Sequence, residues 1–469
     1  MAIELRSRTL ITLRPLQANG ISEIQSAFRN AHKRVGFTAP PGAGKTHMAA
    51  HMVSTAAGKG MDCLFICNRI ELIEQTANAF LEFNIQFGLI GGGFSFDRSQ
   101  QINIGSIDTL KRRIPLIRPP KLVIWDECRG IGAVGWTKVF NAFPDAYHVG
   151  LDATPIRNDG KSLGEYFTHL VSGPTYSELR KLGILVPFKV FAPSIPDMTG
   201  IKTVRGDFDH KPTEALMDRP MLVGDITANF KARAGKRQGL TFACSRVHSE
   251  HLAAQYRAAG INAVHLDGDT DRATRKATVA AFRRGEIQML CNVALFAAGF
   301  DVRGIGVIVD AAPTQSISVA VQRWGRGSRA ENGKEFCELY DHAGNVFRHS
   351  LPDADRTWTL ESAGEKRKKS DDGKSISVRQ CSTCFAVSPA GSAVCRECGA
   401  AFPAMPREVD HVEGDLVEFD AILADKRKAA ARAEVGRAKT LDELKRIARE
   451  RNYRYGWVLK MAQIKRISA

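Results

Sequence analysis

The sequence predicts an α/β protein with two doubly wound parallel sheets, and three observations support this prediction. Short apolar runs alternate with helical patterns between about residues 12 and 345, as expected for right-handed βαβ units. The runs fall into two sets, separated by a less regular segment at 187–220. A chain of 469 residues is long enough for two or three domains, each with its own core.

Ten apolar runs are expected to be strands. The first sheet should contain residues 34–38, 63–67, 101–105, 122–125 and 147–151, and the second should contain residues 239–244, 263–266, 288–293, 306–309 and 335–340. We expect a first domain at 1–195, a second at 196–345, a linker at 346–378, a cysteine-rich module at 379–402 and a helical tail at 410–469. Residues 361–374 have almost no apolar side chains, which is typical of a solvated linker. Thr440 and Glu443 form a capping-box pattern that opens a helix over 441–451.

The composition is that of a basic globular protein. Hydrophobic residues make up 44% and charged residues 25% of the chain, which is ordinary for a globular domain. The net charge of +16 favours a polyanionic partner, although a merely basic soluble protein would carry the same excess. No apolar run reaches the ~18 residues of a membrane span, and no signal peptide is recognisable. We therefore expect a bacterial cytoplasmic protein, or one in the host cytoplasm if it is phage-encoded.

The first half contains a candidate phosphate-binding loop, Ala39-Pro40-Pro41-Gly42-Ala43-Gly44-Lys45-Thr46. It follows a predicted strand and precedes a predicted helix, so its backbone amides and the helix N-terminus can surround phosphate oxygens. Lys45 would neutralise the β and γ phosphates of ATP, and Thr46 would bind Mg²⁺. Ala39 stands where the strict pattern has glycine. The alternative is a chance glycine-rich turn.

Two adjacent acids follow the apolar run at 122–125. Asp126 and Glu127 would lie at the carboxyl end of that strand. There Asp126 could hold Mg²⁺, and Glu127 could orient and deprotonate an attacking water. Acid pairs at strand ends also occur as helix caps, so this pair carries weight only together with the phosphate-binding loop.

Further blocks follow one another in a recognisable order: Leu13-Arg14-Pro15-Leu16-Gln17, Cys67-Asn68-Arg69 through Gln75, Gly105-Ser106-Ile107-Asp108-Thr109-Leu110, Asp126-Glu127-Cys128-Arg129, Asp152-Ala153-Thr154-Pro155, Phe242-Ala243-Cys244-Ser245, His265-Leu266-Asp267-Gly268-Asp269-Thr270, Ala298-Gly299-Phe300-Asp301 and Gln322-Arg323-Trp324-Gly325-Arg326-Gly327-Ser328-Arg329. Together with the phosphate-binding loop, they resemble the motifs of superfamily 2 helicases, a resemblance that covers residues 13–345. It implies two tandem RecA-like domains that close on ATP and Mg²⁺.

The resemblance also implies roles for individual residues. Gln17, beside Arg14, would contact the adenine. Asp301 would contact the ribose or the partner arginine, and Gly299 would belong to the same nucleotide site. The second domain would supply the γ-phosphate side of the site with Gln322, Arg326 and Arg329. Nucleic acid would meet residues of both domains: Arg69, Ser106, Thr109, Ser245 and Thr270.

The sequence departs from the family pattern in three places. Arg129 stands where the second motif usually has His or Asp, and it could pair with Asp152 or with an acid of the second domain. Asp152 itself replaces the serine of the Ser-Ala-Thr block. Arg323 falls between the matched positions of its block and would face solvent.

Four cysteines form a compact cluster near the C-terminus. Cys381 and Cys384 make one Cys-x-x-Cys pair, and Cys395 and Cys398 make a second. Four thiolates at this spacing suit a structural, tetrahedral Zn²⁺ in a short zinc ribbon. Two disulfides or four unligated thiols are the alternatives. The other six cysteines are scattered singly, as in a chain from a reducing compartment.

The C-terminal tail is basic and contains aromatic residues. Residues 426–469 contain 14 Lys or Arg and 4 Asp or Glu, with Tyr453, Tyr455 and Trp457 among them. Such a mixture suits a phosphate backbone with stacked bases. A solvated helix face with aromatics in a small core would give the same pattern.

These observations predict an ATP-dependent helicase or translocase. The resemblance favours DNA over RNA, because the subgroup with the Leu-Arg-Pro-x-Gln block and an added zinc ribbon resembles DNA-acting phage and bacterial enzymes. Partners in replication, recombination or restriction would fit. The alternatives are an ATP-gated binding or remodelling protein and the motor subunit of a restriction system. No convincing acid-acid-lysine nuclease set is present in the sequence.

Overall fold

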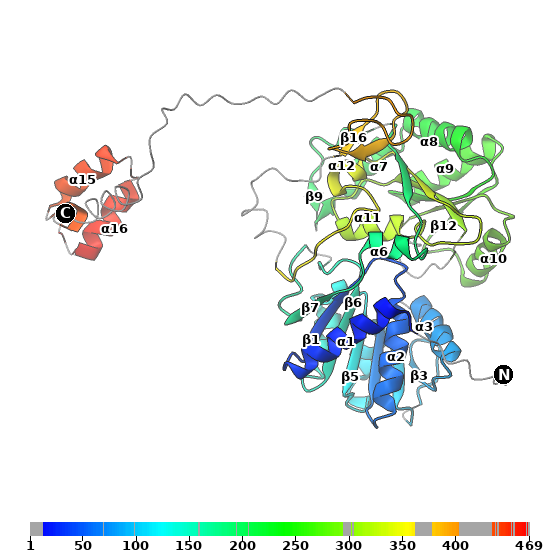
Figure 1. The fold of residues 1–469 in the computed structure, drawn as a ribbon, viewed down its shortest axis with the longest axis horizontal. Helices are drawn as coiled ribbons and strands as arrows, with labels where there is room; N and C mark the ends of the chain where they lie inside the picture. Colours follow the sequence, from blue (N-terminus) through cyan, green and yellow to red (C-terminus); the bar gives the residue numbers. More distant parts are fainter. Residues whose placement is uncertain are drawn as a thin grey trace. The chain divides into compact units, whose positions relative to one another are not determined.

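The computed structural model describes residues 13–361, 378–402 and 434–467, except for 69, 98, 158–159, 194, 205, 294–301, 303, 437, 439, 452, 454 and 466. The chain divides into two compact units, Met1–Pro403 and Ala404–Ala469, and each is described by itself. Figure 1 draws the first unit as two lobes, one blue to cyan and one mainly green to yellow.

The first lobe, residues 13–172, is built on a seven-stranded parallel sheet with the strand order β3-β4-β2-β5-β6-β1-β7. Its elements are α1 (Pro15–Arg29), β1 (Arg34–Thr38), α2 (Lys45–Ala57), β2 (Cys63–Cys67), α3 (Ile70–Glu82), β3 (Gly88–Ile90), β4 (Ile102–Ser106), α4 (Ile107–Arg113), η1 (Ile114–Leu116), β5 (Leu122–Asp126), η2 (Cys128–Gly130), α5 (Val134–Asn141), β6 (Tyr147–Asp152) and β7 (His169–Ser172).

The second lobe, residues 188–349, is built on a six-stranded parallel sheet with the order β12-β13-β11-β14-β15-β8. Helix α6 (Tyr176–Lys181) lies between the lobes in the sequence. The elements of the second lobe are β8 (Phe188–Phe191), β9 (Thr203–Val204), β10 (Asp207–Phe208), α7 (His210–Met217), α8 (Pro220–Arg233), β11 (Gln238–Ala243), α9 (Arg246–Ala258), β12 (Ala263–Leu266), α10 (Arg272–Arg283), β13 (Met289–Asn292), β14 (Ile305–Ala311), α11 (Ile317–Trp324), β15 (Cys337–Asp341) and α12 (Asn345–His349).

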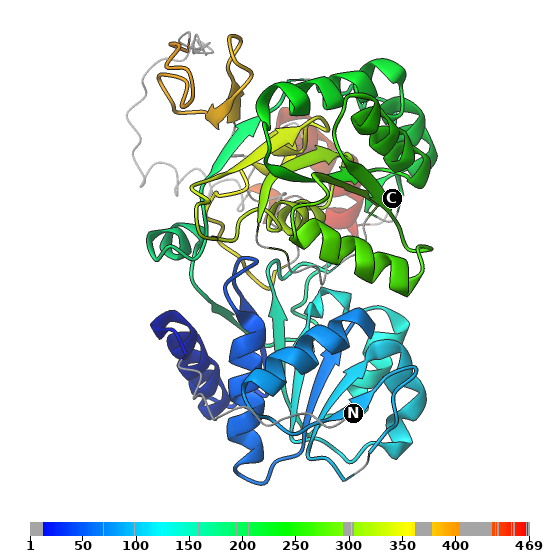
Figure 2. The same ribbon diagram turned by 90° about the vertical axis from the view of Figure 1, so that its right-hand side faces the viewer.

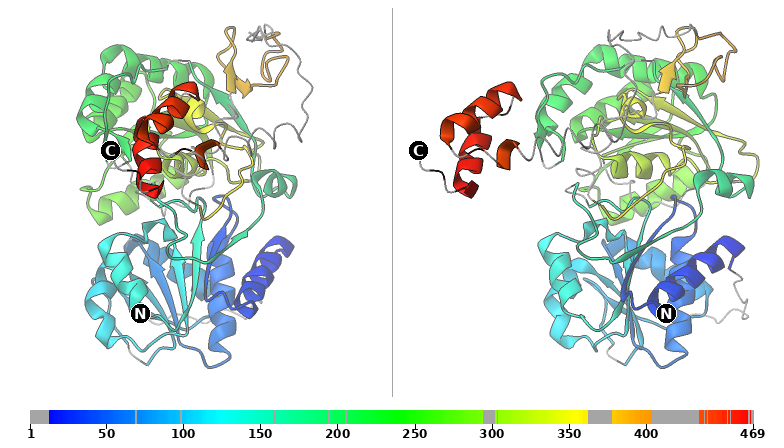
Figure 3. Two further views of the ribbon diagram at one scale, coloured as in Figure 1. Left: turned by 90° about the vertical axis from the view of Figure 1, so that its left-hand side faces the viewer. Right: turned by 60° about the vertical axis from the view of Figure 1, so that its left-hand side comes forward.

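Each sheet is covered by helices on both faces, as Figures 2 and 3 show. In the first lobe, apolar residues of α1, α2 and α3 share one core, and those of α4 and α5 share another. In the second lobe, α8 and α9 pack on one face, whereas Phe282 of α10 and Trp324 of α11 pack on the other. Strands buried on both faces are nearly continuous in apolar residues, and this made them recognisable in the sequence. The α/β fold with two parallel sheets is therefore confirmed.

All ten expected strands are present, with ends within about two residues of the expectation. The two large sheets also contain three strands that were not expected, β3, β7 and β8. Strand β8 precedes residue 195, yet it pairs in parallel with β15 of the second lobe. The second sheet therefore begins before the domain boundary that we placed at 195, because an edge strand can join a sheet whose other strands come much later in the chain.

Much of the expected linker at 346–378 is packed against both lobes. Leu351 is buried, and Leu360 packs with the apolar cluster of the first lobe beneath α4 and α5. Phe188 donates its backbone N–H to Asp353, and Ser177 donates its N–H to Asp355 (2.9 Å). Residues 346–361 of the expected linker thus pack on the lobes, whereas the solvated segment predicted at 361–374 lies, after its first residue, outside the described part of the chain.

The four-cysteine module docks on the second lobe. Its strands β16 (Val378–Gln380) and β17 (Val387–Pro389) form a small antiparallel pair. Ala386 bridges to Phe191 of β8, and Ala192 donates its N–H to the Phe385 carbonyl (3.0 Å). The module therefore extends the core of the second lobe rather than standing apart from it.

The C-terminal unit contains α15 (Leu441–Glu450) and α16 (Tyr455–Lys465) around a small core of its own. The expected capping box is present: Glu443 N–H donates to the Thr440 hydroxyl, and Thr440 N–H donates to the Glu443 carboxylate. Leu444, Ile447 and Val458 are buried, and Tyr455 and Leu459 are exposed. In the part of the chain described here, no helix combines the length and apolar character that a membrane crossing needs.

Candidate nucleotide site and four-cysteine cluster

The phosphate-binding loop joins β1 to α2, as the sequence predicted. Gly42 and Gly44 have φ angles of +87° and +86°, a region that side chains other than glycine rarely adopt. Lys45 begins α2 and turns back into the loop, where its ammonium donates to the carbonyls of Ala39 (2.7 Å) and Pro40 (3.2 Å). The Lys45 side chain thus closes the loop through contacts within its own eight residues.

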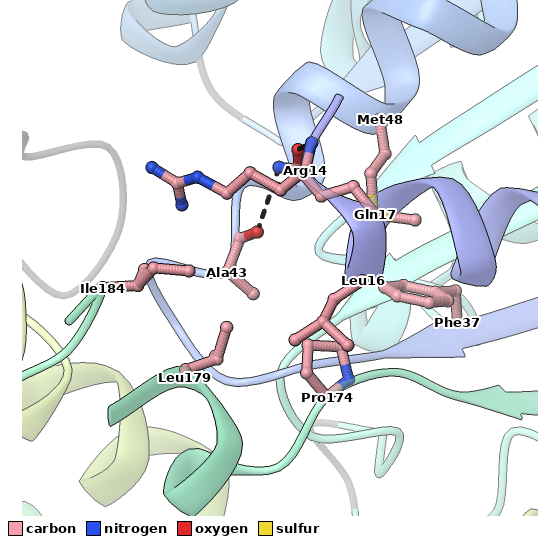
Figure 4. A pocket seen from close by; sticks show the side chains of 9 residues that line it. All are labelled: Arg14, Leu16, Gln17, Phe37, Ala43, Met48, Pro174, Leu179 and Ile184. Carbon is pink, nitrogen blue, oxygen red and sulfur yellow. Dashed lines mark hydrogen bonds between the residues drawn. The ribbon is translucent and has the colours of Figure 1, made fainter. Parts of the chain in front are cut away.

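An apolar pocket adjoins the loop, and Gln17 forms part of its wall (Figure 4). Gln17 is buried and donates its side-chain amide to the carbonyls of Ala43 (3.2 Å) and Gly44 (3.3 Å). The pocket is lined by Arg14, Leu16, Gln17, Phe37, Ala43, Met48, Pro174, Leu179 and Ile184. The last three follow β7, and no sequence signal marked them for this pocket, because they carry only ordinary apolar side chains.

The acid pair ends β5 beside the loop. Asp126 is the last residue of the strand, and Glu127 follows it in a left-handed conformation, with φ of 53°. Burial and the Glu127 carboxylate raise the pKa of Asp126 to about 7. Burial lowers the pKa of Lys45 to about 8, against the opposing effect of Asp152, Asp126 and Glu127. These mutual shifts arise because the ammonium and the carboxylates share one poorly solvated space.

Arg129 is paired with two acids of the first lobe. Its guanidinium lies 2.9 Å from the Asp152 carboxylate and 3.0 Å from that of Glu127. Its backbone N–H also donates to Asp152 (2.9 Å). Of the two partners that the sequence left open for Arg129, an acid of the second domain or Asp152, the structure has Asp152.

The turn at 322–329 packs directly on the phosphate-binding loop. A Cβ atom on Gly325 would lie 2.5 Å from Pro41, and one on Gly42 would lie 3.5 Å from Cγ of Arg329. Gln322 and Arg326 are buried. Burial lowers the pKa of Arg326 to about 10, and the nearby Glu127 carboxylate opposes this shift. Burial also lowers the pKa of Arg329. Arg326, far from Asp126 and Glu127 in the sequence, therefore lies near both carboxylates, and Arg329 lies against the phosphate-binding loop.

Two further contacts join the lobes at this point. The Thr154 hydroxyl donates to the Ser318 hydroxyl in the first turn of α11 (2.7 Å), and both side chains are buried. Val186 donates its N–H to the Ser328 carbonyl (2.8 Å), and Leu185 bridges to Arg329. Sequence analysis singled out none of Leu185, Val186 and Ser318 for the site, because they become neighbours of the loop only when the lobes meet.

Arg323 does not face solvent, which corrects our expectation. It is 9% exposed and donates to the Asp310 carboxylate (3.2 Å) and to the Ala312 carbonyl (2.6 Å). Asp310 also accepts bonds from Trp324 (3.0 Å) and Asn345 (2.9 Å). Arg323 therefore ties α11 to the end of β14.

Four of the candidate nucleic-acid residues lie at the carboxyl edges of the two sheets. Ser106 caps the start of α4 and donates to the Thr109 hydroxyl (3.2 Å). Ser245 accepts the His248 N–H at the start of α9, and the Thr270 hydroxyl bonds to Asp267. Their hydroxyls thus already serve the local backbone and turns. Arg69, Gly299 and Asp301, predicted for the strand and the nucleotide, lie outside the described residues.

The four cysteines come together at one point. Their sulfur atoms all lie within 4.8 Å of one another, and the Cys381–Cys398 and Cys384–Cys395 sulfur pairs are 3.6 Å apart. All ten cysteines of the chain are free thiols, so the disulfide alternative does not apply. A tetrahedral ion at ~2.3 Å from each sulfur needs sulfurs roughly 3.8 Å apart. The cluster has the composition and spacing of a metal site.

Comparison with known proteins agrees with this architecture. Residues 10–157 match the family described as "Type III restriction enzyme, res subunit", and residues 223–331 match the family described as "Helicase conserved C-terminal domain". The chain is 27% identical to a "51.5 kDa protein" of Lactococcus phage (isolate 7-9), over 83% of this chain and 84% of that protein. It is 24% identical to IRC3 of Saccharomyces cerevisiae, described as an ATP-dependent helicase, over 71% of this chain.

The fold resembles solved structures of the same kind. A fragment described as the HsdR subunit of a type I restriction enzyme from Vibrio vulnificus YJ016 aligns with a TM-score of 0.59 and 20% identity, over 72% of this chain and 66% of the fragment. The chain spans only about half the length of the yeast relative (51%). The restriction-subunit match over residues 10–157, the helicase match over residues 223–331 and the two RecA-like sheets in tandem lead to one conclusion. The chain belongs to superfamily 2, the ATP-dependent helicases and translocases.

Proposed function

We propose that the chain is a DNA-dependent ATPase whose two lobes close on ATP and thereby move along a DNA strand. The packing of the turn at 322–329 on the phosphate-binding loop is the observation that carries this proposal, since a Cβ on Gly325 would lie 2.5 Å from Pro41. A nucleotide bound at the loop would meet groups from both lobes. Any change in its phosphates would then alter the contact between the lobes.

The residues of the first lobe would hold the nucleotide. The apolar pocket beside Gln17 suits an adenine ring, and the loop from Pro41 to Thr46 suits the phosphates. Lys45 would exchange the carbonyls of Ala39 and Pro40 for phosphate oxygens. Glu127 would orient the attacking water and accept its proton.

Thr46 and Asp126 fit a site for Mg²⁺ with the nucleotide. Burial and Glu127 raise the pKa of Asp126 to about 7, and such a carboxylate is stabilised in its charged form by a nearby cation. Bound Mg²⁺ would supply charge neutralisation on the β and γ phosphates. The hydroxyl of Thr46, in the first turn of α2, is the second protein ligand that we propose.

The second lobe would act on the γ phosphate through Gln322, Arg326 and Arg329. An arginine at this position stabilises the charge that develops during phosphoryl transfer and contributes a factor on the order of 10³ to the rate. The desolvated environment of Arg326 strengthens its interaction with a phosphate. Gly299 and Asp301 remain candidates for the ribose.

The four-cysteine cluster would hold Zn²⁺ in a closed, structural site. Four thiolates leave no open coordination position, so the ion would stabilise the fold and take no part in hydrolysis. Both knuckles end on left-handed residues, Phe385 with φ of 60° and Gly399 with φ of 72°. Because the module packs on the edge strand β8, it would stabilise the edge of the second sheet.

Several residues are proposed for the nucleic acid. Ser106 and Thr109 in the first lobe, Ser245 and Thr270 in the second, and Arg69 would contact its backbone. The basic C-terminal unit would add affinity, since Tyr453 and Tyr455 are exposed there among basic residues. The net charge of +16 is consistent with such a partner.

The test is the ATPase rate with single-stranded DNA, duplex DNA, forked DNA and RNA at one fixed salt concentration, because nucleic-acid affinities depend steeply on salt. We expect one of the DNAs to stimulate the rate more than RNA does. A larger response to RNA would contradict the choice of DNA, and a rate indifferent to all four would contradict the coupling itself. Strand displacement on the fork, measured alongside, separates a helicase from a translocase.

A further inference from the structure

Glu127 is held in an unusual backbone conformation beside a buried arginine. Its φ of 53° and ψ of 52° lie in the left-handed region, which costs a residue other than glycine free energy and persists only where the surroundings enforce it. The Arg129 guanidinium lies 3.0 Å from the Glu127 carboxylate. The side chains of Glu127 and Arg129 are only 17% and 10% exposed. The carboxylate that we propose to act on water therefore has a charged neighbour in its own turn.

The same guanidinium is fixed at its other end by Asp152. One nitrogen (Nη1) lies 2.9 Å from Asp152 Oδ1, and the other (Nη2) is the one that faces Glu127. Asp152 also accepts the backbone N–H groups of Arg129 (2.9 Å), Ala153 (2.7 Å) and Thr154 (3.2 Å). The aspartate therefore fixes both the turn after β5 and the loop after β6, and its side chain is 1% exposed.

The loop after β6 continues this network to the other lobe. Thr154, held by Asp152, donates its hydroxyl to Ser318 in the first turn of α11 (2.7 Å). Helix α11 contains Gln322 and leads into the turn with Arg326. A continuous set of polar contacts thus runs from Glu127 through Arg129 and Asp152 to the second lobe.

We propose that Arg129 is a positioning residue that holds Glu127 for its reaction with water, and that Asp152 is the partner without which Arg129 cannot do so. The two-pronged guanidinium is essential to this role, because a single ammonium cannot bond to both carboxylates in these directions. Arg129 and Asp152 act as a pair, since removal of either one takes from the other a partner of opposite charge in a buried place. This inference rests on the proposed role of Glu127.

The central variant is Arg129→Lys. It retains the positive charge beside Asp152 but lacks the second guanidinium nitrogen that faces Glu127. We expect it to fold normally and to lose at least about 10-fold in kcat of the nucleic-acid-stimulated ATPase, with KM for ATP within about threefold of wild type. Turnover within twofold of wild type would overturn the proposal. Arg118→Lys is the matched control, because Arg118 forms an exposed pair with Asp62 in the same lobe; it should leave kcat unchanged.

A second variant separates positioning from mere stability. Arg129→Met with Asp152→Asn removes both buried charges together, and we expect a melting temperature near that of wild type. If the pair positions Glu127, this folded double variant still hydrolyses ATP at least about 10-fold more slowly than the wild type. If the pair is only structural, its kcat returns with its stability, and the proposal fails.

Glu127→Gln distinguishes a failure of this inference from a failure of the proposed function. Combined with Arg129→Lys, it should be no slower than Glu127→Gln alone, since Arg129 acts through Glu127. If the two substitutions reduced kcat by independent factors that multiply in the double variant, Arg129 would act elsewhere than through Glu127. That result would overturn the positioning role. A Glu127→Gln enzyme as active as wild type would instead remove the proposed role of Glu127 itself.

Discussion

The phosphate-binding loop and the turn at 322–329 both bring positive charge towards Asp126 and Glu127, but they are held in place in different ways. The loop is shaped by its own chain: glycines at φ near +87° and a lysine bonded to carbonyls five and six residues earlier. The turn is shaped by distant partners, with Arg323 on Asp310, Gly325 on Pro41 and Ser328 on Val186.

Because of this difference, we expect substitutions in the loop to affect ATP hydrolysis more than the stability of the fold. Lys45 can lose its ammonium without loss of the fold, because its hydrogen bonds go to carbonyls of its own loop. Within four residues, the turn contains one side chain for the candidate site and one that stabilises the fold. Arg326 lies in the candidate site, whereas Arg323 is directed to a buried aspartate, so neighbouring arginines should fail in different ways.

The largest expected effect is at the loop. Lys45→Ala removes the ammonium that neutralises phosphate charge, and we expect ATP hydrolysis to fall to background while the melting temperature changes little. A coupled ATPase assay and a thermal melt test this pair of outcomes. A large loss of stability would show that the fold beyond the loop depends on Lys45, contrary to the comparison.

Arg326→Ala should be almost as damaging to turnover, by a factor on the order of 10³. Because this arginine is assigned to the transferring phosphate, binding of a fluorescent ATP analogue should persist. Equal loss of ATP binding and turnover would make Arg326 a ligand of bound ATP before the reaction. Its role would then no longer differ from that of Lys45.

Asp310→Ala should act on the fold rather than on the chemistry. It leaves Arg323 without its buried carboxylate and removes an acceptor from Trp324 and Asn345. We expect the free energy of unfolding to drop by about 3–5 kcal/mol, measured by urea denaturation. Near-native stability would mean that Arg323 is not the anchor of α11.

Removal of metal from the four-cysteine cluster should have a more local effect. If Zn²⁺ is bound, elemental analysis gives about one equivalent, and a strong chelator lowers the melting temperature of the second lobe. ATP binding at the first lobe should remain, since the cluster packs on β8 and not on the phosphate-binding loop. A metal-free protein with an unchanged melt contradicts the assignment.

The smallest effect is expected from the C-terminal unit. Deletion of residues 404–469 leaves the first unit whole and removes a basic module, so DNA affinity should fall roughly 10-fold at low salt. Fluorescence anisotropy with a labelled strand measures this change, and basal ATPase activity without DNA is the control. Unchanged affinity would assign the aromatic residues of this unit to its small core alone.

The sequence alone determined the local features. Apolar runs predicted ten strands, the glycines and Lys45 predicted the loop, and the paired Cys-x-x-Cys spacing predicted the cluster, because each of these depends on a few neighbouring residues. The family resemblance then assigned Arg326 to the γ-phosphate side of the site and offered Asp152 as one of two possible partners for Arg129.

The tertiary structure decided what depends on distant contacts. It placed β8 in the second sheet, packed residues 346–361 on both lobes and turned Arg323 inward, because strand pairing and burial depend on which surfaces meet. It also joined Arg129 to Asp152 and Glu127, and Thr154 to Ser318. Local pattern specifies which groups a segment offers, whereas only the packing of the lobes fixes the partners that bind them.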